Sequence, residues 1–283
     1  MQTNKPQPLV TVYVPTYNRV ELLQRAVNSV LKQDYRNIEL IVVDDNSTDS
    51  THEYLAKMAN EDLRFKYLIN DKNSGACVSR NRAIFAANGE FITGLDDDDY
   101  FLPDRIDFFI RAALKDPNKA YYTKSRVKIT TQKVINPGKQ YKLKTRSIKK
   151  PSLLLKQNFI GNQIFTRTKL LQSSGGFDEK LGSWQDLECW FNLLKTQRIE
   201  AYRLNTPTQV VDLSHAHERI SRKKINNMIS SYKYITEKHN LNELQKFILH
   251  GQLLQYNSRQ FNTIHKLALF LLTRQAFYLK SLI

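Results

Sequence analysis

The chain has 283 residues, 41% of them hydrophobic, which suits one large domain or one domain with an appendage. Its 43 basic and 27 acidic residues give a net charge of +16, which indicates an anionic partner such as a nucleotide, a nucleic acid or an anionic membrane face. There is no run of 18 or more apolar residues and no apolar segment of a secretory signal, so we expect neither a membrane-spanning helix nor secretion. The spacing of Cys77 and Cys189 suits neither a metal nor a disulfide, so a reducing compartment is expected.

Short apolar runs alternate with helical patterns in the N-terminal part of the chain. Strands are predicted at residues 9–14, 38–43, 65–69 and 90–95, with a helix after each of the first three. This alternation predicts a mostly parallel sheet with right-handed crossovers and helices on both faces. The loops after the first, second and fourth strands are polar or acidic, and they should line the edge of the sheet where a nucleotide would bind. Gly-x-Gly-x-x-Gly and Gly-x-x-x-x-Gly-Lys are both absent, so a dinucleotide site and a P-loop are not expected.

Four consecutive carboxylates, Asp96 to Asp99, follow the fourth predicted strand. Like charges on adjacent residues repel one another, and a divalent cation would relieve that repulsion, because hard cations prefer carboxylate oxygens. The alternative is a solvated acidic turn before a helix that begins near Pro103, where acids suit the helix dipole. The position at the end of a buried strand favours the metal site.

Residues 119–150 contain no acid. They predict a strand or hairpin that turns at 136–138 and continues as a basic loop, which is either a solvated surface loop or a cover over a phosphorylated substrate. Further strands are predicted at 159–165, 199–204 and 209–211, and helices begin near 169 and 184. Residues 222–283 predict three basic helices, at 222–239, 241–259 and 262–282. These form either an appendage packed on the core or an amphipathic element on a membrane surface.

Six short segments occur in an order that we associate with one family. They are residues 15–19 (PTYNR), 43–47 (VDDNS), 73–81 (NSGACVSRN), 95–99 (LDDDD), 175–178 (GGFD) and 184–186 (WQD). With them the chain resembles the family 2 glycosyltransferases of bacterial surface polysaccharides (colanic acid, O-antigen or capsule). The resemblance implies an α/β protein with the GT-A nucleotide-diphospho-sugar transferase fold over residues 1–221. Its nucleotide-binding half would be about 9–118 and its acceptor half 119–221. Residues 222–283 match no segment of the family and would be a basic helical C-terminal appendage.

The resemblance also implies roles for individual residues. Pro15, Tyr17 and Arg19 would border the donor base and ribose, Asp45 with Asp44 would accept a hydrogen bond from the base, and Gly75 and Arg80 would lie near the nucleotide. Asp96 and Asp98 match the Asp-x-Asp of the family, in which Asp98 would bind the metal and Asp96 or Asp97 the ribose, with Asp96 as a further metal ligand. His217 matches a histidine that reaches the metal or the diphosphate, with His215 as the alternative. Asp186 matches the catalytic base, although Gln185 stands where the family usually has Glu.

The chemistry of sugar transfer agrees with these residue types. Negative charge builds on the leaving diphosphate, so a cation must meet it, and the acceptor hydroxyl must lose a proton to a carboxylate. If the two groups lie on opposite faces of the anomeric carbon, the displacement is direct and inverts the configuration without a covalent intermediate. The competing interpretation of Asp186 is a helix cap.

The expected function is therefore an inverting glycosyltransferase that depends on Mn²⁺ or Mg²⁺ and transfers a hexosyl or N-acetylhexosaminyl group. The expected donor is a UDP-sugar, with GDP and dTDP as alternatives, and the acceptor is a glycan or a lipid-linked glycan. We expect a cytoplasmic protein, peripheral on the inner face of the membrane. The rival functions are a nucleotidyltransferase that makes the activated sugar and a basic nucleic-acid-binding protein. No nucleic-acid partner is expected, because aromatic residues do not interleave with the basic run after Tyr141 and because the acidic cluster would repel phosphates unless it held a metal ion.

Overall fold

A computed structural model describes residues 7–135, 147–215, 225–255 and 263–273 of the chain. Its first sheet has the order β3-β2-β1-β4-β9. The strands are β1 (Val10–Thr16), β2 (Ile38–Asp44), β3 (Phe65–Ile69), β4 (Phe91–Gly94) and β9 (Thr166–Arg167). All neighbours in this sheet are parallel except β4 and β9. The predicted parallel α/β sheet is thus confirmed.

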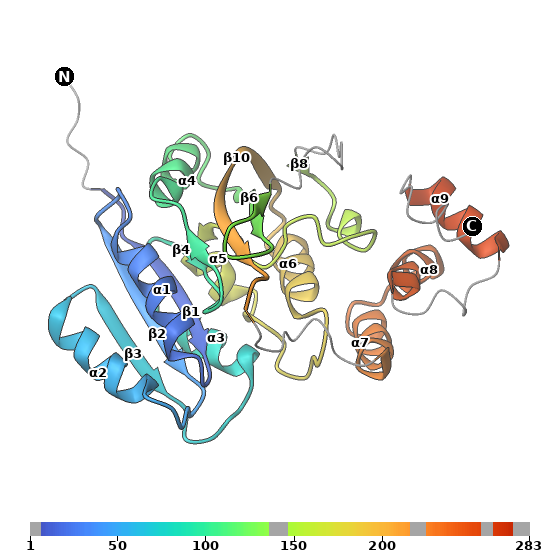
Figure 1. Cartoon of the computed structure of the whole chain (residues 1–283). Coiled ribbons are helices and arrows are strands. Elements are labelled where there is room, and N and C mark those ends of the chain that lie inside the picture. Colours follow the sequence, from blue (N-terminus) through green and yellow to red (C-terminus); the bar gives the residue numbers. More distant parts are fainter. Residues whose placement is uncertain (1–6, 136–146, 216–224, 256–262, 274–283) are drawn as a thin grey trace.

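Helices cover both faces of this sheet, as predicted (Figure 1). They are α1 (Val20–Leu31), α2 (Thr51–Glu61), α3 (Ala76–Ala86) and α4 (Arg105–Ala113). Because side chains alternate along a strand, Val12 and Val14 of β1 pack in one apolar cluster with Leu23 of α1. Tyr13 points to the opposite face and packs in a second cluster with Ile84 of α3. The loops that follow the parallel strands are therefore left free to form a site at the carboxyl edge of the sheet.

A second sheet of order β5-β10-β6-β7 lies beside the first. It contains β5 (Tyr100–Phe101), β6 (Ala120–Lys128), β7 (Val134–Ile135) and β10 (Ala201–Asp212), with β8 (Ser147–Ile148) also paired to β10. Strands β6 and β7 form the predicted hairpin, but they turn at residues 130–133, and residues 136–138 lie outside the described part of the chain. The two strands predicted at 199–204 and 209–211 are one strand, β10, whose register shifts between Leu204 and Gln209.

The strand predicted at residues 159–165 is wrong. Gly161 has a φ of +87°, and Asn158 exchanges side-chain hydrogen bonds of 3.0 and 3.1 Å with the backbone of Gly161. This local turn replaces the backbone pairing of a strand, and only a bridge between Phe165 and Tyr121 precedes β9. The consequence is functional, because the turn places residues 157–162 beside the site described below.

The remaining helices are α5 (Thr168–Ser173), α6 (Gln185–Thr196), α7 (Ile225–Lys238), α8 (Glu243–His250) and α9 (Thr263–Thr273), with 3₁₀ turns at Pro151–Leu153 and Gly251–Gln255. Helix α7 is fastened to α6 through Glu188, a fully buried residue of α6. Its Oε1 lies 2.7 Å from Nζ of Lys238 and 2.9 Å from Nε2 of His239. The C-terminal helices thus begin as a packed extension of the core. None of the helices in the described residues is long and apolar enough to cross a membrane.

Candidate active site

A cavity of about 800 Å³ lies at the carboxyl edge of the first sheet. It is bordered by the loops after β1, β2 and β4, by the start of α3 and by the start of α6. Predicted site residues that line it are Pro15, Tyr17, Arg19, Asp45, Gly75, Arg80, Asp96, Asp97, Asp98 and Asp186. Asp44 does not line it: its carboxylate is fully buried and contacts Ser47 and His52. His217 lies outside the described residues.

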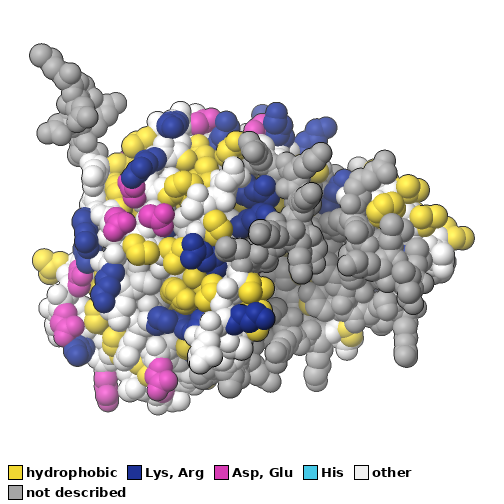
Figure 2. All heavy atoms as spheres, turned by 45° about the horizontal axis from the view of Figure 1, so that its top comes forward, with side chains coloured by type: hydrophobic (Ala, Val, Ile, Leu, Met, Phe, Trp, Pro, Cys, Tyr) yellow, Lys and Arg dark blue, Asp and Glu magenta, His cyan; other side chains and the backbone are white. Residues whose placement is uncertain are grey.

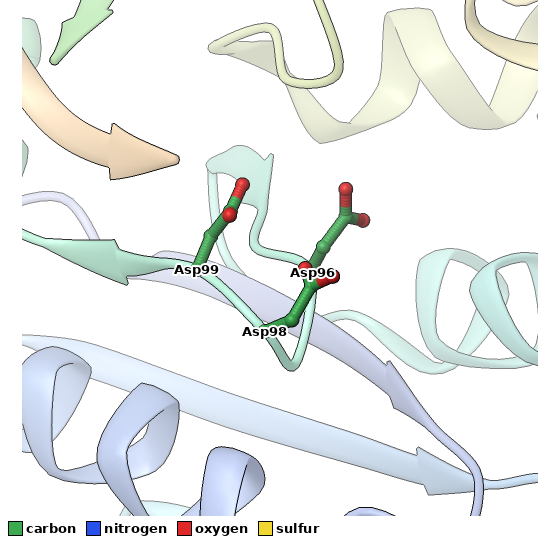
Figure 3. A group of neighbouring side chains, drawn as sticks. All are labelled: Asp96, Asp98 and Asp99. Carbon is green, nitrogen blue, oxygen red and sulfur yellow. The ribbon is translucent and has the colours of Figure 1, made fainter. Parts of the chain in front are cut away.

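Three carboxylates after β4 form a cluster that could hold a cation. One oxygen from each of Asp96, Asp98 and Asp99 lies within 4.8 Å of the others, and all three side chains come from the short loop between β4 and β5 (Figure 3). Nε2 of His215 lies 3.3 Å from Oδ2 of Asp98. Carboxylate oxygens with a neighbouring imidazole suit Mg²⁺ or Mn²⁺, so the residues present fit the metal that was expected.

Asp99 was not among the predicted ligands, and His215 was only the alternative to His217. Asp99 is held by three donors: the backbone N–H of Asp212 at 3.0 Å, the amide of Asn162 at 3.1 Å and the amide of Gln209 at 3.2 Å. The row of four acids in the sequence contained Asp99, but only the fold shows which of the four converge. Asn162 carried no signal in the sequence, because the segment around it was predicted as a strand.

Asp97 does not belong to the convergent set, and it ties the loop after β4 to β1. It accepts hydrogen bonds from Thr16 Oγ1 at 2.9 Å and from Arg19 Nη1 at 3.2 Å. Burial raises the pKa of Asp97 to about 6, and the guanidinium of Arg19 partly opposes that rise. Asp97 is therefore a brace for the acidic loop and is not one of the three convergent carboxylates.

Asp45 organises the loop that leads into α3. Its Oδ1 accepts from the Asn70 amide at 2.6 Å and from the Ser74 N–H at 2.8 Å, and its Oδ2 accepts from the Gly75 N–H at 2.7 Å. Gly75 has a φ of +92°, a conformation that favours glycine, and the helix begins at the next residue. The side chain lines the cavity while it fixes this turn, and its predicted contact with a base remains a prediction.

Arg80 connects the acidic cluster to α6. Its Nη2 lies 3.0 Å from Oδ1 of Asp96, its Nη1 donates to Oε1 of Gln185 at 3.3 Å, and its guanidinium lies over the ring of Phe177. Burial opposes the charge on Arg80, but Asp96 and Asp186 outweigh this and raise its pKa above the ordinary value. A fixed positive charge thus lines the cavity.

Asp186 lies in the first turn of α6 and is half-buried. Its Oδ1 is buried and meets no hydrogen-bond donor among the described residues. Burial raises the pKa of Asp186 to about 7, although Arg80 works in the opposite direction. Helix α6 has Trp184 at its N-cap and no side-chain capping bond, so the helix-cap interpretation of Asp186 is wrong. What remains is a cavity-lining carboxylate whose pKa suits proton transfer near neutral pH.

Comparison with known proteins gives a family. A family model described as glycosyl transferase family 2 matches residues 11–175. A protein of Escherichia coli K12 named for colanic acid biosynthesis, the glycosyl transferase WcaA, is 35% identical over 219 residues, which is 77% of each chain. The GalNAc(5)-diNAcBac-PP-undecaprenol beta-1,3-glucosyltransferase of Campylobacter jejuni is 42% identical over 96 residues, 34% of this chain and 31% of that protein.

Solved structures show the same fold. TarS 1–349 of S. aureus in complex with UDP-GlcNAc matches this chain with a TM-score of 0.69 at 22% identity. The match covers 89% of this chain and 73% of the TarS chain. The mannosyltransferase PcManGT of Pyrobaculum calidifontis, in complex with GDP-Man and Mn²⁺, matches with a TM-score of 0.63 at 19% identity. This match covers 93% of the present chain and 72% of the PcManGT chain. The match of the family model over more than half of the chain, with the 35% identity to the E. coli protein, assigns the chain to glycosyltransferase family 2 as a glycosyltransferase with the GT-A fold.

Proposed function

We propose that this glycosyltransferase is inverting and metal-dependent, and that it moves one sugar from a nucleoside-diphosphate-sugar to a glycan acceptor in the synthesis of a bacterial surface polysaccharide. The observation that carries the proposal is the layout of the cavity, which is lined by the convergent carboxylates, by Asp186 and by Arg80. Arg80 is ion-paired with Asp96, and the charge of Asp186 also raises its pKa. The relatives named for colanic acid and for an undecaprenol-linked glycan support the polysaccharide role.

In this proposal Asp96, Asp98 and Asp99 would hold Mn²⁺ or Mg²⁺, with a histidine, His215 or His217, beside them. The ion supplies positive charge for the leaving diphosphate. Arg19 and Arg80 add fixed positive charge in the same cavity, where negative charge develops on the diphosphate. The acceptor hydroxyl loses its proton to Asp186 while its oxygen bonds to the anomeric carbon and the bond from that carbon to the diphosphate breaks. One direct displacement of this kind inverts the anomeric configuration and needs no enzyme nucleophile.

The donor is proposed to be a UDP-sugar, with GDP and dTDP as the alternatives to be screened. Pro15, Tyr17 and Asp45 border the part of the cavity that would take the base and ribose. The structures of similar fold were solved with UDP-GlcNAc and with GDP-Man, so the fold is compatible with more than one base. A hexosyl or N-acetylhexosaminyl group is the transferred unit that we propose.

The C-terminal region supports a location on the cytoplasmic face of the membrane, with a lipid-linked acceptor. Residues 222–283 contain ten basic and two acidic residues. Helix α9 buries Leu269 in the core but exposes Ile264 (77%), Leu267 (46%) and Leu271 (55%). In Figure 2, hydrophobic side chains gather at this end of the molecule. Positive charge combined with an exposed apolar face suits an anionic lipid surface.

The test is a donor screen. UDP-, GDP- and dTDP-sugars are incubated with the protein and Mn²⁺ without acceptor, and the released nucleoside diphosphate is measured. We expect slow release from sugars of one base only. Pyrophosphate formed from a nucleoside triphosphate and a sugar 1-phosphate would instead support the nucleotidyltransferase, which has no need of Asp186. If the protein releases no nucleoside diphosphate and binds no nucleotide-sugar, the proposed function is overturned.

A further inference from the structure

One end of the cavity has a wall that the family model does not cover. The match to the family model ends at residue 175. Three residues beyond it nevertheless line the cavity together with Asp186: Trp184, Met228 of α7 and Gln252 of the 3₁₀ turn at Gly251–Gln255. Gln157 and Asn158, from the turn that replaces the predicted strand, line it as well. An indole, a thioether and three amides thus line the same cavity as the proposed base, which is a typical lining for a small polar ligand with apolar faces.

Trp184 is held in a conformation that is unusual for its residue type. Its φ is 57° and its ψ 26°, the left-handed region, which bulky side chains rarely adopt. Three of the other described non-glycine residues with positive φ, Asn18, Asn46 and Asn240, are asparagines, which tolerate this region. Backbone strain of this kind persists only where the surrounding structure enforces it, and it concentrates at ligand sites.

The C-terminal helices supply that enforcement. The backbone N–H of Ser183 donates to Oγ of Ser231 on α7 at 3.2 Å. The indole of Trp184 packs against the main core and also against the small apolar cluster of Met228, Leu253 and Leu269. The ring is therefore held between the two clusters. Trp184 is only half-buried, and it lines the cavity two residues before Asp186.

We propose that Trp184 is the stacking platform for a pyranose ring of the acceptor, and that α7 and the turn at Gly251–Gln255 form the wall that selects this ring. The inference rests on the proposed function and names the acceptor subsite within it. The C–H face of a pyranose is apolar and its rim carries hydroxyls, so an indole can cover the face while a carboxylate two residues away receives a hydroxyl proton. Amide side chains at the rim match the remaining hydroxyls.

The first experiment uses the intrinsic fluorescence of the protein. The chain has two tryptophans, and Trp190 is fully buried, so a sugar stacked on Trp184 changes one accessible indole. The protein is loaded with Mn²⁺ and with the nucleoside diphosphate that the donor screen identifies. It is then titrated with methyl glycosides of glucose, galactose and N-acetylglucosamine, and with the acyclic polyol sorbitol as control. We expect a saturable change with at least one pyranoside and none with sorbitol. No saturable change with any pyranoside overturns the proposal.

The second experiment uses variants. Trp184→Asn keeps a residue type that tolerates the left-handed backbone but removes the ring, and Trp184→Phe retains an aromatic face. We expect Trp184→Asn to lower kcat/KM for transfer to the best pyranoside by about 10- to 100-fold, mainly through KM, and Trp184→Phe to recover most of it. Donor affinity and the hydrolysis of donor by water should fall much less than transfer to the pyranoside. Phe85→Ala is the matched control, because Phe85 is an exposed aromatic residue that does not line the cavity.

The outcomes separate this inference from the proposed function. Wild-type transfer by Trp184→Asn overturns the stacking role while donor hydrolysis still supports a glycosyltransferase. An equal fall in hydrolysis and transfer, with a lower melting temperature, would mean that Trp184 only joins α7 to the core, and this also overturns the proposal. A protein that binds no nucleotide-sugar would instead contradict the function itself.

Discussion

Replacing Asp186 by asparagine separates proton transfer from every other role of this side chain. Asp186→Asn keeps the shape of the residue but cannot accept the proton of the acceptor hydroxyl. General-base catalysis is worth about 10²–10⁴-fold, so the transfer rate should fall by that amount while the dissociation constant of the donor stays nearly unchanged. Because the pKa of Asp186 is raised to about 7, the wild-type rate should also rise with pH and level off above that value, and the variant should lose this dependence.

The same substitution should stabilise the fold. The pKa rises from 3.8 to about 7 on folding, so the folded state binds the proton more tightly than the unfolded state does. Stability is then highest below the unfolded pKa and falls as the pH rises towards the folded one. A rise of that size means that folding makes ionisation of the Asp186 carboxyl less favourable by a free energy of roughly 4 kcal/mol. Since the side chain is only half-buried, we expect Asp186→Asn to gain about 1–2 kcal/mol at pH 8 and less at pH 5.

Asp178→Asn is the matched control. The pKa of Asp178 is lowered, because hydrogen bonds from Lys238, the Lys180 N–H and Tyr234 outweigh the effect of burial. Its replacement should therefore destabilise the protein at pH 8, opposite to Asp186→Asn. The measurements are thermal unfolding at the two pH values and nucleoside diphosphate release with acceptor present. Wild-type transfer by Asp186→Asn would refute the base assignment, and a loss of stability at pH 8 would refute the electrostatic argument.

Three further predictions concern the metal, the C-terminal helices and the hairpin. A chelator should abolish transfer, and full activity in chelator would exclude a metal role. Asp99→Asn should raise the Mn²⁺ concentration required for half-maximal rate by more than Asp97→Asn does, because Asp99 belongs to the convergent set and Asp97 does not. Replacing Ile264, Leu267 and Leu271 together by serine should reduce flotation of the protein with anionic phosphatidylglycerol vesicles. The control Leu63→Ser, at a leucine that is 96% exposed and lies outside the C-terminal region, should not reduce it. Equal flotation of the two variants would show that the exposed face of α9 does not contact lipid. Amide hydrogen exchange in residues 120–135 should slow when donor or acceptor binds, because Ser125 lines the cavity, and unchanged exchange would exclude a covering role.

The first sheet could be predicted because its signals are local. Strands such as Ile38–Asp44 are short β-branched runs that end in polar loops, and in a parallel sheet these loops must meet at one edge. The acidic cluster followed from the same argument, since it comes directly after β4. Sequence order and strand polarity were therefore enough to bring Arg19, Asp45 and Asp98 to one cavity.

The second sheet and part of the site could not be predicted from local sequence patterns, because they depend on contacts between distant residues. Strand β10 pairs in parallel with β6, and Ala201 lies opposite Ala120, a pairing across about 80 residues that no local pattern encodes. The positive φ of Gly161 turned an apolar run into a loop, and Asn162 reached Asp96 and Asp99 as a result. Asp99 itself was visible in the sequence, but which neighbouring carboxylates converge depends on backbone geometry after β4.

The contact between Glu188 and α7 bears on where this protein can be shortened. The family model ends at residue 175. The boundary predicted from the sequence between the glycosyltransferase domain and the basic C-terminal region is residue 221. A chain cut at 221 would nevertheless leave the carboxylate of Glu188 inside the core without Lys238 and His239. Removing one partner of a buried ion pair typically costs about 3–5 kcal/mol, a large share of the stability of an ordinary domain. The catalytic part and α7 should therefore melt as one cooperative unit, and the limit of family similarity is not the limit of independent folding.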